Sequence, residues 1–86
     1  MGVVEDLGDA LAIETLKAME ELDNDRFHNE VSRVVGASSP TLQEAFLTSM
    51  RIRMAAERGR KFVEATLKAK REGGAAPAAP RDTSAH

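Results

Sequence analysis

The longest patterned segment of this chain runs over residues 40–72 and reads PTLQEAFLTSMRIRMAAERGRKFVEATLKAKRE. Ser39 and Pro40 stand at its start, and Gly73 and Gly74 follow it. Ser is a preferred helix N-cap, Pro suits the first helical position, and Gly commonly ends a helix. The segment therefore predicts one unbroken helix, about 50 Å long at a rise of 1.5 Å per residue. The rest of the chain is expected to pack on it.

The apolar residues of this predicted helix change their arrangement near Ala56. Before Ala56 they occur on nearly all sides, which indicates two neighbours. After Gly59 one side is apolar and the other is charged. We expect one face to contact the N-terminal helices and the other to contact a helix of a partner. The predicted partner-binding residues are Ile52, Ala55, Gly59, Phe62 and Val63.

The N-terminal part predicts two shorter helices. Apolar or small residues recur at steps of three and four at Val4, Leu7, Leu11, Thr15, Ala18 and Leu22, which is the spacing of an amphipathic helix. Residues 23–25, Asp-Asn-Asp, favour a break. A second helix is predicted from about Arg26 to Val35, and Gly36 suits a left-handed C-terminal cap.

Together these patterns predict an all-α fold, with two short N-terminal helices packed on one long C-terminal helix as a helical hairpin or three-helix arrangement. Residues 1–72 are expected to form a single helical domain, and the Ala/Pro/Gly-rich residues 73–86 a flexible, disordered tail. The predicted core within the chain consists of Leu7, Leu11, Leu22, Phe27, Val31, Leu42 and Phe46.

The composition favours an assembly over a lone domain. The chain has 86 residues, with three Phe, no Trp or Tyr, and no Cys to form a disulfide. A core of this size is marginal without a partner. Residues 1–36 carry nine acidic and three basic side chains, and residues 37–72 carry four acidic and eight basic ones. The two halves either complement each other, within the chain or between subunits, or form two solvated faces. We predict a homo-oligomer, a helical protein partner, or both.

The sequence offers little for catalysis. It lacks a Cys nucleophile, a Gly-rich phosphate loop and a Ser flanked by the glycines of a nucleophile elbow. Asp25 and His28 have the carboxylate-x-x-His spacing of helical di-iron sites, but such a site needs several more ligands. A helix cap and a surface histidine are the simpler interpretation. We therefore expect no enzyme activity, no cofactor and no metal.

A second interpretation is a helix-turn-helix over residues 28–47, HNEVSRVVGASSPTLQEAFL. The second helix of such a motif enters the major groove with its first turns. Gln43 would read adenine, Thr41 would contact a phosphate, and Arg51 begins a basic run. Glu44 and the acidic balance of the chain oppose this alternative, which is a small DNA-binding regulator.

Neither a secretory signal nor an apolar run long enough to span a membrane is found in the sequence. We therefore predict a cytoplasmic protein without membrane contact. The predicted function is a non-enzymatic helical interaction module, namely a small adaptor, chaperone-like or assembly protein that acts through helix–helix contacts.

Overall fold

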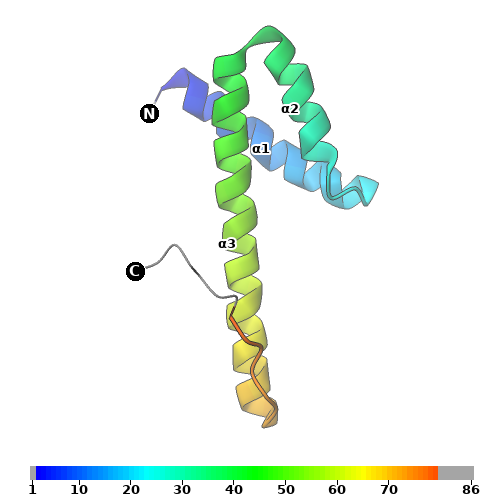
Figure 1. The fold of residues 1–86 in the computed structure, drawn as a ribbon, viewed down its shortest axis with the longest axis vertical. Coiled ribbons are helices and arrows are strands. Elements are labelled where there is room, and N and C mark those ends of the chain that lie inside the picture. The colour runs from blue at the N-terminus through cyan, green and yellow to red at the C-terminus, as the bar shows by residue number, and fades with distance from the viewer. Residues whose placement is uncertain (1, 80–86) are drawn as a thin grey trace. The chain divides into compact units, whose positions relative to one another are not determined.

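The computed structural model describes residues 2–79, and within that range it contains three helices and no strand (Figure 1). The helices are α1 (Val3–Leu22), α2 (Phe27–Ser38) and α3 (Pro40–Glu72). The predicted all-α class is thus confirmed, and α3 has the predicted bounds. Residues 74–79 follow without regular secondary structure. The remainder of the predicted tail, residues 80–86, lies outside the described residues.

The chain divides into two compact units at a point within α3. The first unit ends at Met54 and holds α1, α2 and the first turns of α3, and the second unit begins at Ala55. The prediction of a single domain over residues 1–72 stays a prediction.

Helix α1 ends at the predicted break. Asp23 adopts a left-handed conformation, with φ of 52°. Its N–H donates to the carbonyl of Glu20 at 3.2 Å, and the N–H of Asn24 donates to the carbonyl of Met19 at 3.0 Å. This pair of bonds is a Schellman motif, which satisfies carbonyls that the helix leaves free. The same pattern ends α3, where Gly73 has φ of 72° and Gly74 donates to Ala69 at 2.8 Å.

A single residue, Ser39, joins α2 to α3. Its backbone is extended, with φ of −152° and ψ of 99°, because a residue before proline is disfavoured in the helical region. Its N–H closes α2 on the carbonyl of Val35 at 2.9 Å, and its hydroxyl accepts the N–H of Leu42 at 3.0 Å. Ser39 therefore ends one helix and caps the next, as the Ser-Pro pair predicted.

The predicted role of Gly36 as a left-handed cap is wrong. Helix α2 continues through Gly36 to Ser38. A Cβ at Gly36 would collide with the side-chain amide of Gln43 on α3. Gly36 therefore lies inside α2 beside the Gln43 side chain, and no turn is required at that position.

The core of the first unit is small. Ala12, Phe46 and Met50 are buried, and half-buried residues from all three helices pack around them. This outer layer comprises Leu11, Leu16, Met19, Val31, Leu47 and Met54. Phe46, Leu11 and Val31 thus belong to the core region as predicted.

Two residues of the predicted core are exposed. Leu7 and Leu22 keep 54% and 55% of their surface in solvent. The buried positions of α1 are instead Gly8, Ala12 and Thr15. The apolar spacing predicted that the large side chains of α1 are buried. In the structure, the small residues of α1 face the neighbouring helices instead. The remaining predicted core residues, Phe27 and Leu42, are half-buried.

The close approach of α1 to α3 explains why the small residues of α1 are buried. A Cβ at Gly8 would lie 3.0 Å from the carbonyl carbon and Cβ of Ala45 and from the backbone nitrogen of Phe46. The backbones therefore meet at Gly8, and the side chains of Leu7 and Leu22 are left to solvent.

Candidate interaction surfaces

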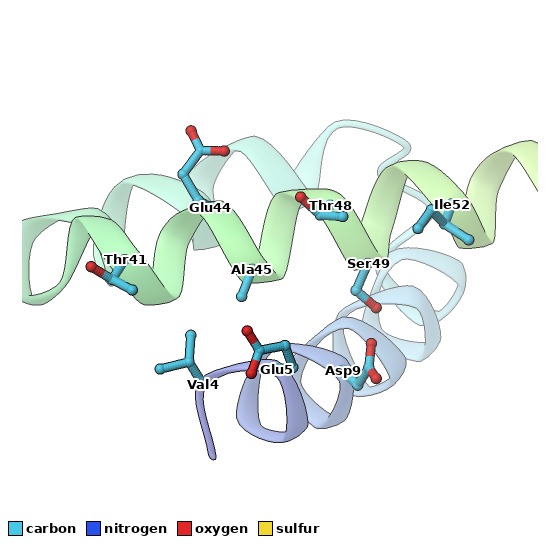
Figure 2. A pocket seen from close by; sticks show the side chains of 9 residues that line it. All are labelled: Val4, Glu5, Asp9, Thr41, Glu44, Ala45, Thr48, Ser49 and Ile52. Carbon is cyan, nitrogen blue, oxygen red and sulfur yellow. The ribbon is translucent and has the colours of Figure 1, made fainter. Parts of the chain in front are cut away.

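An open groove lies between the first turns of α1 and the first half of α3 (Figure 2). Its volume is about 440 Å³. Helix α1 contributes Val4, Glu5 and Asp9, which rise towards α3, while Ala45 and Ser49 point back towards α1. The other lining residues on α3 are Thr41, Glu44, Thr48 and Ile52. Three of the lining residues are apolar (Val4, Ala45 and Ile52) and three are acidic (Glu5, Asp9 and Glu44), and the Glu44 side chain points away from α1 (Figure 2).

One basic residue partly compensates the acidic side chains of the groove. The Nε of Arg53 donates to the hydroxyl of Ser49 at 3.1 Å, and its Nη2 lies 3.9 Å from a carboxylate oxygen of Asp9. Both charged side chains of this ion pair are more than a third exposed, so water screens the attraction. Glu5 and Glu44 have no ion pair among residues 2–79, and the groove therefore keeps a negative character.

Ile52, the first predicted partner-binding residue, lines this groove and is 63% exposed. The other four, Ala55, Gly59, Phe62 and Val63, belong to the second unit and are exposed on α3. At 3.6 residues per turn these four share one side of the helix with Thr66 and Leu67. We call this side the apolar face. Nothing in the second unit lies within 4 Å of a Cβ built at Gly59.

Charged pairs centred on Arg60 border this face beside Leu67 and continue towards the opposite side of the helix. Arg60 donates from Nε and Nη2 to the two carboxylate oxygens of Glu57, at 3.0 and 2.6 Å, and from Nη1 to Glu64. These hydrogen bonds, with the positive charge of Arg60, hold the pKa of Glu57 below its ordinary value. Hydrogen bonding to Glu57 likewise raises the pKa of Arg60. Such exposed pairs favour a solvated helix and contribute little to its contacts.

The three residues of the DNA-binding alternative do not form one exposed surface for a base and a phosphate. Gln43 donates its side-chain amide to the carbonyl of Ser32 at 2.9 Å and to the hydroxyl of Ser32 at 3.1 Å. The amide that would read a base thus contacts α2. Thr41 and Arg51 are exposed, and Thr41 lines the groove. A helix-turn-helix uses a turn of three or four residues, but here only Ser39 separates the helices.

The Asp25 and His28 pair gains no further ligand in the structure. Among residues 2–79 no three His, Cys, Asp or Glu side chains come together in a way that would hold a metal ion. The Nδ1 atom of His28 is buried and has no hydrogen-bond partner within that range.

The sequence alone did not predict the groove. Val4 belongs to the apolar spacing of the first predicted helix, and nothing in the sequence pattern connects Val4, Glu5 and Asp9 with α3. The signal that was present is the small residue Gly8 between them, which marks a close helix crossing and hence a hollow beside it.

No helix within residues 2–79 has the length and apolar character required to cross a membrane. No protein-family model, no curated protein and no solved structure shows significant similarity to this chain.

Proposed function

We propose that this protein is a non-enzymatic helical interaction module, an adaptor or assembly protein, that binds itself or a helical partner through the apolar face of α3. The observation that carries the proposal is the exposure of that face. Phe62, Val63 and Leu67 are 37%, 55% and 45% exposed, although they occupy adjacent turns of one helix. Apolar side chains gathered on one face are typical of contact surfaces, whereas single exposed ones are ordinary.

The small core supports the same proposal. Only three hydrophobic residues are buried in the part of the chain that the structure describes. Small domains usually gain the missing stability from disulfides, metals or assembly, and the sequence contains no Cys. Contact of the apolar face with another helix would remove further apolar surface from water, at about 25 cal/mol per Å².

Substitution within the apolar face tests the proposal. We expect Phe62→Ser and Val63→Ser each to weaken association by about tenfold or more, because burying a side chain of this size contributes about 1.5–3 kcal/mol. Sedimentation velocity over a concentration series measures the change. Far-UV circular dichroism checks that the helices persist.

Val34→Ser is the matched control. Val34 is 74% exposed on α2, outside the apolar face, so its loss is expected to leave association unchanged. Equal behaviour of all three variants and the parent chain would contradict the proposal.

A further inference from the structure

We propose that the partner of the apolar face is the groove of a second copy of this chain. Two copies would dock reciprocally, with residues 55–72 of each α3 lying in the groove of the other. This inference rests on the proposed function and adds to it the identity of the partner and the acceptor site.

Charge complementarity selects the occupant. Residues 1–54 carry ten acidic and five basic side chains, whereas residues 55–72 carry three acidic and six basic ones. The first unit is therefore net acidic and the helical segment of the second net basic. Two such segments would repel each other if paired directly, but a basic segment and an acidic groove attract.

The chemistry of the two surfaces also matches. An amphipathic helix binds a groove by placing apolar anchors on its floor and its charges at the rim. The apolar residues that line the groove are Val4, Ala45 and Ile52, and the incoming segment offers Phe62 and Val63 as anchors. At 3.6 residues per turn its apolar face is flanked by Arg58 on one side and by Arg60 and Arg71 on the other, and Arg60 is paired with Glu57 and Glu64. The guanidinium group of Arg58 would lie near the carboxylate of Glu5, which faces α3 in the groove (Figure 2).

Reciprocal docking would give a dimer in which no groove and no basic segment is left unused. The groove and the basic segment both belong to the same chain, so a two-fold pair uses both surfaces of both chains. The predicted product is a dimer whose formation weakens as salt rises, because exposed charges separated by more than a Debye length are screened.

Charge reversal with neighbouring controls tests the arrangement. Glu5→Lys places a positive charge in the groove, whereas Asp6→Lys makes the same change in the same first turn of α1 at a residue that does not line it. Arg58→Glu reverses a charge beside the apolar face, and Lys61→Glu reverses one on nearly the opposite side of the helix. Sedimentation equilibrium gives the dimer dissociation constant of each variant.

We expect Glu5→Lys and Arg58→Glu to weaken the dimer by about tenfold, since each change occurs at both two-fold-related contacts, and we expect the two controls to leave it unchanged. Mixing Glu5→Lys with Arg58→Glu is expected to restore a tight dimer. In that pair one contact carries both reversed charges and the other carries neither. The mixture also decides the matter if either variant alone is poorly folded.

The outcomes separate this inference from the proposed function. If Phe62→Ser weakens association while Glu5→Lys does not and mixing restores nothing, the groove is not the acceptor, but the apolar face remains an interaction surface. If association is tight but forms only larger, open assemblies, reciprocal docking is wrong. If the parent chain remains a monomer at all concentrations and Phe62→Ser alters nothing, self-docking and the self-association on which it rests both fail.

Discussion

Individual residues decide how the first unit packs, and Gly8 is the clearest case. Its missing side chain allows the backbone of α1 to meet α3 at Ala45. The atoms in the way of an added Cβ include backbone atoms, which yield less readily than the end of a flexible side chain.

We expect Gly8→Ala to lower the free energy of unfolding by about 1–2 kcal/mol. Overpacking of this kind costs about 1–3 kcal/mol, and the better helix propensity of Ala returns up to about 1 kcal/mol. Urea denaturation followed by circular dichroism measures the difference.

Gly59→Ala is the control for helix propensity, because a Cβ at Gly59 has nothing within 4 Å. Because Gly59 belongs to the apolar face, the comparison is made at a concentration at which the chain is monomeric, where the propensity gain of up to about 1 kcal/mol is unopposed. If Gly8→Ala stabilised the protein as much as Gly59→Ala, the close crossing of α1 and α3 would be refuted.

At the scale of elements, the junction of α2 and α3 shows how local chemistry separates two helices. Pro40 lacks the N–H that would bond the carbonyl of Gly36, and it forces Ser39 out of the helical conformation. The hydroxyl of Ser39 then satisfies the N–H of Leu42 at 3.0 Å. One residue is enough because the cap and the proline act together.

Replacing this cap is expected to cost about 1 kcal/mol of stability in Ser39→Ala, the ordinary value for a lost N-cap. Ser39→Asp keeps a capping oxygen and should unfold close to the parent chain. Thermal unfolding of the two variants makes the comparison. Equal losses in both would show that the hydroxyl contributes nothing as a cap.

The bounds of α3 and the break after α1 were predictable because they depend on local signals, whereas α2 runs past its predicted end to Ser38. Ser39, Pro40 and Gly73 act through capping and backbone conformation, which neighbouring residues determine. The buried face of α1 was not predictable in the same way. Spacing favoured Leu7 and Leu22, but the buried set depends on where α1 crosses α3. That crossing is a tertiary contact that a single helix pattern does not contain.

The same distinction holds for the candidate surfaces. The exposed apolar face of α3 follows from the one-sided pattern after Gly59, and the structure leaves Phe62 and Val63 accessible as that pattern implied. The groove could not be predicted from a local pattern, because Val4 and Ile52 are 48 residues apart in the sequence and only the helix crossing brings them to one site. The sequence pattern predicted that Gln43 is available for base contacts. Its hydrogen-bond partner, Ser32, lies on another helix, so the pattern of one helix does not reveal that bond.

At the scale of the whole molecule, three features point to assembly. The core is small, an apolar face is exposed on a charged helix, and the two parts of the chain carry opposite net charge. Each has a simple explanation by itself, but association accounts for all three. The proposed association would cover the apolar face, enlarge the buried surface and bring the opposite charges together.

If the apolar face of α3 mediates self-association as proposed, the molar mass of the unmodified chain in solution depends on its concentration. Light scattering across micromolar concentrations is the measurement. We predict a mass that rises with concentration from that of the 9.3 kDa chain towards twice that value, and that falls back as salt is added. A constant mass of one chain, in a protein that unfolds cooperatively, would contradict self-association.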